Sequence, residues 1–255
     1  MIHLLEHWNA IAGRLTQAER LLLMLDFDGT LAPIVPRPSD ARIPDAALST
    51  LRKLQASPGV TLAIISGRGA RDVRALAGLA DAHYFGSHGR ERIRPGSTEV
   101  ESDPAGLSQI RACCRRLAEE LGHIEGFQVE DKGAAAAAHF RNVDARHWQR
   151  VERAVRQAAA IGSLDVSQGK RVFDITPNDG VDKGTAALEL LGELGGLPIY
   201  FGDDTTDETA FAALPDEAIT VYVGPEAGDS GARYRVGGPE EVGRALAWLA
   251  ASVCA

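Results

Sequence analysis

The chain has 255 residues, enough for one large domain or two smaller ones with a buried core. Its 45% hydrophobic and 24% charged residues are ordinary for a globular protein and exclude a disordered or fibrous chain. The formal net charge of -8 argues against a nucleic acid or an anionic membrane as partner, because both need a basic face.

The three cysteines, Cys113, Cys114 and Cys254, have a spacing that suits neither a disulfide framework nor a zinc site. Free thiols indicate a reducing compartment. No run of residues approaches the roughly 18 apolar residues of a spanning helix, and the N-terminal segment lacks the basic start of a signal peptide. We therefore expect a soluble, cytoplasmic protein that is a monomer.

The first part of the chain alternates between helical and strand patterns. Residues 2–20 place apolar residues at helical spacing, which predicts an amphipathic helix. Short apolar runs then predict strands buried on both faces, with helices between them. The predicted strands cover residues 21–25, 60–65 and 82–85, and the predicted helices cover residues 44–55 and 68–77. This alternation indicates βαβ units and a parallel sheet.

The pattern changes after about residue 95. Two hairpins and two helices are predicted there, over residues 127–131 with 134–141, 164–168 with 171–175, 104–121 and 144–160. Hairpins mixed with helices indicate an α+β unit with an antiparallel sheet. The βαβ pattern resumes at residue 182, with helices over 182–194, 207–213 and 240–251 and strands over 197–201 and 218–223.

The simplest architecture is an α/β protein with one interrupted domain. We expect a Rossmann-like, doubly wound parallel-sheet core formed by residues 1–97 and 178–255. Residues 98–177 form an inserted α+β cap.

Two carboxylates, Asp26 and Asp28, follow the first predicted buried strand. Ligands of open parallel sheets bind beyond the carboxyl ends of the strands. Like charges this close repel unless a cation lies between them. Mg²⁺ is the expected ion, because it prefers a few carboxylates together with water and phosphate.

Three further motifs carry chemistry. Ser66-Gly67-Arg68 ends a predicted strand and opens a helix, which is suited to a phosphate. Lys183 begins a helix, where the dipole disfavours a cation unless it binds an anion. Residues 202–208 hold four carboxylates directly after a strand, including Asp203, Asp204 and Asp207.

These four motifs, in this order, resemble those of the haloacid-dehalogenase-like phosphatases with a C2-type cap. Five stretches are more narrowly similar to the trehalose-6-phosphate phosphatases: residues 28–35, 87–89, 130–132, 139–141 and 202–208. The resemblance implies Mg²⁺-dependent hydrolysis of trehalose 6-phosphate to trehalose and phosphate, the last step of trehalose biosynthesis, through an aspartyl-phosphate.

The resemblance also implies roles for the motif residues. Asp26 is the expected nucleophile and Asp28 the expected acid and base. Ser66 and Lys183 hold the phosphate oxygens. Mg²⁺ binds the Asp26 carboxylate, the Asp28 backbone carbonyl and Asp203. The carboxylates of Asp204 and Asp207 bind the ion directly or through water, which completes the expected metal site.

The cap is expected to bind the sugar. The candidate contacts are Gly67 and Arg68 beside the phosphate, His88, and Glu130, Lys132, His139, Arg141 and Lys170. Strict alternation puts Glu130 with Lys132, and His139 with Arg141, on one strand face. The family usually carries Glu-x-Arg-Pro near the end of the cap, where this chain reads Asp174-Ile175-Thr176-Pro177.

That departure keeps a different substrate open, such as a glucosyl-glycerate phosphate or sucrose phosphate. Two alternatives belong to other classes of protein. A phosphoacceptor signalling domain would use a similar acidic pair, hydroxyl and lysine, but needs neither the cap nor Asp28 as an acid. A sugar sensor would keep the fold and bind without releasing phosphate.

Overall fold

The computed structural model describes residues 1–102, 104–169, 171–225 and 229–253. Its contacts divide the chain into two compact units, one of residues 1–100 with 182–255 and one of residues 101–181. The predicted domain limits were residues 97 and 177. Within the described ranges, no helix has both the length and the apolar composition needed to cross a bilayer.

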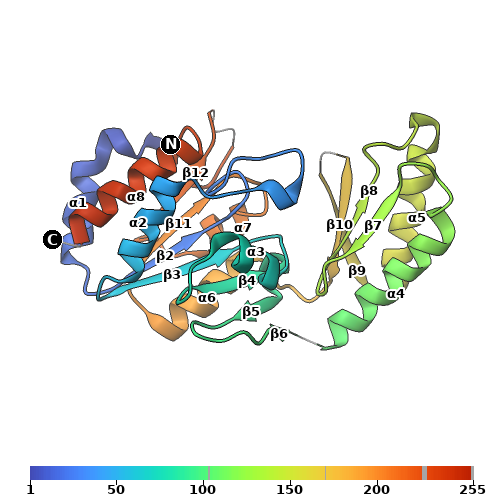
Figure 1. The fold of residues 1–255 in the computed structure, drawn as a ribbon, viewed down its shortest axis with the longest axis horizontal. Helices are drawn as coiled ribbons and strands as arrows, with labels where there is room; N and C mark the ends of the chain where they lie inside the picture. The colour runs from blue at the N-terminus through green and yellow to red at the C-terminus, as the bar shows by residue number, and fades with distance from the viewer. Residues whose placement is uncertain (103, 170, 226–228, 254–255) are drawn as a thin grey trace. The chain divides into compact units, whose positions relative to one another are not determined.

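A mostly parallel sheet forms the centre of the first unit, in the strand order β1-β13-β12-β11-β2-β3-β4-β5 (Figure 1). The strands are β1 (Ile2–His3), β2 (Leu21–Leu25), β3 (Val60–Ile65), β4 (His83–Gly86), β5 (Glu91–Ile93), β11 (Leu197–Gly202), β12 (Ile219–Val223) and β13 (Tyr234–Val236). Neighbouring strands run parallel, except β5, which is antiparallel to β4. The short apolar runs form these central strands because both of their faces are covered.

Helices cover both faces of this sheet. The helices are α1 (Trp8–Gln17), α2 (Asp45–Gln55), α3 (Ala70–Ala77), α6 (Lys183–Leu194), α7 (Glu208–Ala213) and α8 (Pro239–Val253), with short 3-10 turns η1 (Leu5–His7), η2 (Pro38–Asp40) and η3 (Ser87–Gly89). In β2, Leu23 and Leu25 join one hydrophobic core with α1, α2, α3 and α8. Leu22 and Met24 face the other core, with α6 and α7. The doubly wound fold is confirmed.

The second unit is an α+β fold of its own. Its elements are β6 (Glu101–Ser102), α4 (Pro104–Leu121), β7 (Gln128–Asp131), β8 (Ala136–His139), η4 (Ala145–His147), α5 (Trp148–Ile161), β9 (Leu164–Gln168) and β10 (Val172–Pro177). The antiparallel sheet has the order β7-β8-β10-β9. Phe173, Ile175 and Ala138 pack with the two helices on one face of the sheet. Among the described residues of this unit, both α-helices pack on that one face.

Some expectations were wrong in detail. Residues 2–20 are not one helix, because Ile2 and His3 pair with Tyr234 and Arg235 of β13. Such pairing with a distant strand overrides a local helical pattern. The short strands β5 and β13 were not predicted. The two predicted hairpins form one sheet, since β8 pairs with β10.

Candidate active site

The candidate site lies at the carboxyl ends of three adjacent parallel strands. β11, β2 and β3 are neighbours in the sheet. Asp203 follows β11, Asp26 and Asp28 follow β2, and Ser66 follows β3. Because parallel strands end at the same edge, residues more than 170 positions apart in sequence meet there: the Thr30 hydroxyl is 3.5 Å from Asp203 Oδ1.

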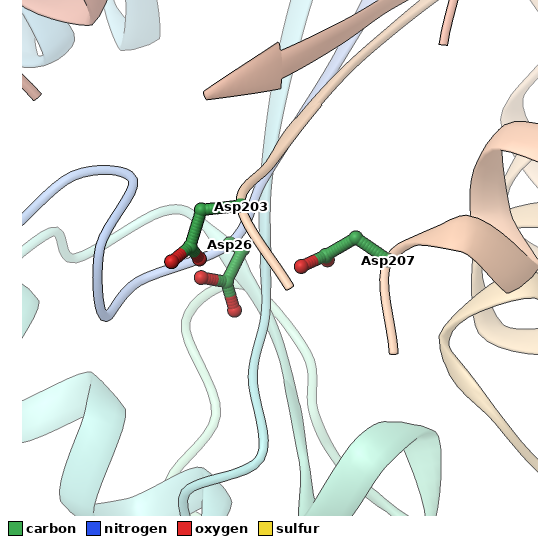
Figure 2. Close-up of side chains that lie close together, drawn as sticks. All are labelled: Asp26, Asp203 and Asp207. Carbon is green, nitrogen blue, oxygen red and sulfur yellow. The ribbon is translucent and has the colours of Figure 1, made fainter. Parts of the chain in front are cut away.

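Three carboxylates form a compact cluster at this edge. Asp26, Asp203 and Asp207 each offer one oxygen, and these oxygens lie within 4.8 Å of one another. Figure 2 shows Asp26 and Asp203 side by side, with Asp207 extending toward them from the start of α7. Asp26 and Asp207 are buried and Asp203 is half-buried. A cluster of this kind is stable only with a compensating cation.

Lys183 supplies part of that compensation. Its Nζ donates to Asp26 Oδ1 and Asp207 Oδ1, both at 2.8 Å. The lysine is the first residue of α6, and Asp182 caps that helix by accepting from the Thr185 N–H. The cap fixes the helix start, so the buried ammonium is held at the cluster.

The acidic groups shift one another's pKa. Burial raises the pKa of Asp26 well above its ordinary value; Lys183 opposes this, and the neighbouring carboxylates add to it. Burial and Asp207 raise the pKa of Asp203 to about 6. Burial alone would lower the pKa of the Lys183 ammonium, but Asp207 and Asp26 outweigh it and the pKa is raised. When ionised, the three carboxylates of the cluster face a single ammonium, so negative charge is in excess.

That excess charge and the all-oxygen donor set fit a hard divalent cation such as Mg²⁺. The half-buried Asp203 gives the cluster a side open to solvent and ligand. Asp204, although in the same motif, is exposed, and its Oδ1 accepts from the Thr205 N–H.

Gly29 lets the chain turn closely past this cluster. Its φ is +86°, and a Cβ there would lie 2.0 Å from Asp203 Oδ2. A side chain would both strain the backbone and displace the carboxylate. The glycine therefore allows the Asp26–Asp28 segment and Asp203 to approach.

Asp28 is held by Arg68. The Arg68 Nε donates to Asp28 Oδ2 at 2.5 Å, and Nη2 donates to Oδ1 at 2.8 Å. This is a bidentate ion pair, the strongest common geometry for these groups. Arg68 was predicted to contact substrate, and in the structure its guanidinium binds Asp28, the predicted acid and base.

Ser66 is buried at the end of β3, and its Oγ accepts from the Arg68 N–H at 3.2 Å. His88 lies next to it, because its N–H donates to the Ser66 carbonyl at 3.0 Å. A Cβ on Gly67 would lie 2.8 Å from the His88 ring, so the glycine permits that approach. The predicted residues Ser66, Gly67 and His88 are thus brought together.

In the second unit, a polar cluster lies on the sheet face opposite α4 and α5. Glu130 and Asp174 flank Ala137 on either side in the strand register. His139 Nε2 lies 3.0 Å from Glu130 Oε2, and Lys132 Nζ lies 3.6 Å from Asp174 Oδ1. We call these four residues the cap cluster.

β7 ends at Asp131 and β8 at His139, so Lys132 and Arg141 lie just beyond the strands expected to contain them. Lys132 still reaches the face of Glu130, as expected, because its Nζ lies 3.6 Å from Asp174 Oδ1. Arg141 is exposed. Lys170, also predicted to bind sugar, lies outside the described residues.

Sequence reasoning missed several contributors. Tyr200 donates its hydroxyl to Asp207 Oδ1 at 2.8 Å from inside β11, where its sequence looks like any buried strand residue. Asp72 and the Pro38 carbonyl hold Arg68 at 2.9 and 2.8 Å. The spacing of four residues between Arg68 and Asp72 was a signal for the first contact. Nothing local signalled the second.

Comparison with known proteins agrees with this arrangement. The fold is similar to that of a solved haloacid dehalogenase-like hydrolase from Bacteroides thetaiotaomicron, with a TM-score of 0.65 at 19% identity, covering 90% of this chain and 99% of that one. The trehalose-phosphatase family model matches residues 24–234. The chain belongs to the trehalose-phosphatase family.

Individual relatives are similar over most of the chain. A probable trehalose-phosphate phosphatase 4 of Oryza sativa subsp. japonica is 32% identical over 93% of this chain and 68% of its own length. An uncharacterized glycosyl hydrolase of Mycobacterium tuberculosis is 37% identical over 93% of this chain, which spans only 19% of that protein. The solved trehalose-6-phosphate phosphatase of Aspergillus fumigatus has a TM-score of 0.70 at 26% identity, covering 96% and 97% of the two chains.

Proposed function

We propose that this protein hydrolyses trehalose 6-phosphate to trehalose and phosphate, in the Mg²⁺-dependent final step of trehalose biosynthesis. The observation that carries the proposal is the cluster of Asp26, Asp203 and Asp207 around the Lys183 ammonium. Membership of the trehalose-phosphatase family supports the same reaction.

Asp26 is the nucleophile of the first step. Lys183 binds its Oδ1, so we assign the attack on phosphorus to Oδ2. A bond forms between Asp26 and phosphorus, the bond from phosphorus to the sugar oxygen breaks, and a proton from Asp28 goes to that oxygen. Water attacks the aspartyl-phosphate in the second step, with Asp28 as the base.

The remaining residues bind the phosphate. An ammonium has three donors, and two of those on Lys183 already point at carboxylates, which leaves one for a phosphate oxygen. Ser66 supplies a hydroxyl at the start of the loop into α3. These groups stabilise the charge that gathers on the equatorial oxygens in the transition state.

Mg²⁺ fits the cluster, with Asp26, Asp203 and the Asp28 carbonyl as proposed ligands and Asp204 and Asp207 as neighbours. When bound, it supplies the positive charge that lets an anionic carboxylate approach an anionic phosphate. Burial and, after it, the charge of Asp207 raise the pKa of Asp203 to about 6, and such an ion would offset the charge of Asp207.

Residues 98–177 are proposed to act as the specificity cap. The cap cluster of Glu130, Lys132, His139 and Asp174 offers several donors and acceptors on one sheet face, which suits sugar hydroxyls. Arg141, His88 and Lys170 remain proposed contacts. Asp174 stands where the family usually has glutamate, so another sugar phosphate is the second candidate substrate.

The test is phosphate release from trehalose 6-phosphate, sucrose 6-phosphate, glucosyl-phosphoglycerate and glucose 6-phosphate, each with Mg²⁺ and with EDTA. We expect turnover of trehalose 6-phosphate far above the others, lost with EDTA and in the variant Asp26→Asn. If a different sugar phosphate is turned over and Asp26→Asn abolishes that turnover, the proposed mechanism holds and the proposed substrate is wrong. Binding of sugar phosphates without any release would indicate a sensor.

A further inference from the structure

Several groups of the first unit hold the Arg68 side chain in place. Besides the two bonds to Asp28, its Nη1 donates to Asp72 Oδ2 at 2.9 Å and its Nη2 to the Pro38 carbonyl at 2.8 Å. The guanidinium also lies 5.5 Å from the centre of the Phe27 ring. Only 12% of the side chain is exposed. The guanidinium is therefore fixed before any ligand arrives.

The fixed guanidinium of Arg68 sets the orientation of the Asp28 carboxylate. Both of its carboxylate oxygens accept from Arg68, so the orientation of the carboxylate is fixed as well as its distance. Each of these oxygens keeps a further lone pair that can accept a hydrogen bond from water. The Asp28 side chain is 38% exposed, against 6% for Asp26, so water reaches it.

We propose that Arg68 is a positioning residue for the second half of the reaction, holding Asp28 as the base that activates water. The inference rests on the proposed function, since it needs a phosphorylated Asp26. Arg68 acts through Asp28 and touches neither the phosphate nor the sugar in this step.

The second half of the reaction releases phosphate from Asp26. A water oxygen bonds to phosphorus, and the bond from phosphorus to the Asp26 oxygen breaks, which returns Asp26 as a carboxylate. One water proton passes to an Asp28 oxygen, and inorganic phosphate leaves. That proton is the one Asp28 gives to the sugar oxygen of the next substrate.

An arginine suits this task because its planar fork fixes a carboxylate in orientation as well as in distance. Lysine at the same position would supply the charge with a single flexible ammonium. Asp72, in the first turn of α3, holds the outer side of the fork and is itself exposed. Removal of Asp72 should weaken the same function without touching Asp28.

The test uses p-nitrophenyl phosphate and trehalose 6-phosphate with the full chain and Mg²⁺, in stopped flow and at steady state. Nitrophenol has a good leaving oxygen, so its release reports phosphorylation of Asp26 with little need for an acid. The variants are Arg68→Met, Arg68→Lys and Asp72→Asn. Arg71→Met, which changes an exposed arginine of α3, is the matched control.

For Arg68→Met we expect a nitrophenol burst approaching one per enzyme, followed by steady turnover about 10²-fold slower than in the native protein, in the range of general-base contributions. The slow turnover should be the same for both substrates, because both pass through one phosphoenzyme. Arg68→Lys should be intermediate, Asp72→Asn should fall a few-fold, and Arg71→Met should be unchanged.

Three results would overturn the proposal. A larger loss with the sugar phosphate than with the aryl phosphate, without a burst, would place Arg68 in the first step. A rise in KM with unchanged kcat would make it a substrate contact. A burst and turnover equal to the native protein's would remove any role. If Arg68→Met does not fold, Asp72→Asn carries the same comparison.

Absence of phosphoenzyme in the native protein would instead count against the proposed function. The two failures are therefore distinguishable. Trapping by acid quench during turnover provides this control, and the trapped fraction should rise in Arg68→Met.

Discussion

The two units of the molecule place their lysine–carboxylate pairs in different surroundings, one buried and one partly exposed. In the first, Lys183 is 3% exposed and lies 2.8 Å from each of two buried carboxylates. In the second, Lys132 lies 3.6 Å from Asp174, and the side chains of both are partly exposed. Buried charges depend strictly on their partners, whereas solvent can replace a partner at a surface. The first arrangement suits fixed chemistry, and the second suits adjustable recognition.

The largest expected effect compares the two lysines directly. Lys183→Met leaves Asp26 and Asp207 buried without their ammonium, so we expect the free energy of unfolding to fall by about 3 kcal/mol. Phosphatase activity should fall by at least about 10³-fold, because the phosphate also loses a donor. Chemical denaturation and turnover measure the two effects.

Lys132→Met is the matched control on the cap cluster, and its unfolding free energy should change by less than about 0.5 kcal/mol. Equal destabilisation by the two substitutions would contradict the contrast between the buried and the surface lysine.

The next largest effect is a pH dependence of stability that comes from the first unit. His83 is buried in β4, and burial together with Arg92 lowers its pKa to about 4. In the unfolded chain its pKa is about 6.5. The folded state therefore favours the neutral ring, and this stability is present above pH 6.5 and is lost as the pH falls toward 4. Unfolding free energy should drop by about 2 kcal/mol between pH 7 and pH 5 from this group.

His83→Gln should remove that part of the pH dependence, whereas His123→Gln, at an exposed position of the second unit, should leave it unchanged. Urea titrations at the two pH values provide the measurement. An unaltered slope in His83→Gln would mean that another group causes the acid sensitivity.

The smallest expected effect is on the cap cluster. Glu130→Gln and Asp174→Asn should each raise KM for the sugar phosphate by about 10-fold through loss of a charged hydrogen bond, with kcat changed less than about 3-fold. Glu152→Gln, on the outer side of α5 and paired with Arg156, is the control. A fall in kcat without a change in KM would assign the cap cluster to chemistry and not to recognition.

Prediction from sequence worked where local pattern and topology coincide. Asp26, Ser66 and Asp203 each follow an apolar strand, and parallel strands end at one edge, so their meeting could be expected. The pairing of Asp28 with Arg68 could not, because it depends on how the Arg68 side chain crosses to the neighbouring strand end.

The sheet face shared by Glu130 and Asp174 could not be predicted from the sequence either. It exists because β8 pairs with β10 in a register that puts Ala137 opposite both residues. Pairing between hairpins depends on tertiary packing, and a shift of one residue would turn every side chain to the other face. Tyr200 could not be predicted either, because its place in a buried strand pattern gives no sign that its hydroxyl donates to Asp207.

Phosphorylation of Asp26 during turnover can be measured by acid quench followed by peptide mass analysis. With trehalose 6-phosphate and Mg²⁺, we expect the peptide that contains Asp26 to gain one phosphoryl group, which hydroxylamine removes. Asp26→Asn should show no such peptide. Rapid phosphate release with no modified peptide, or with the phosphoryl group on a different residue, would contradict the account.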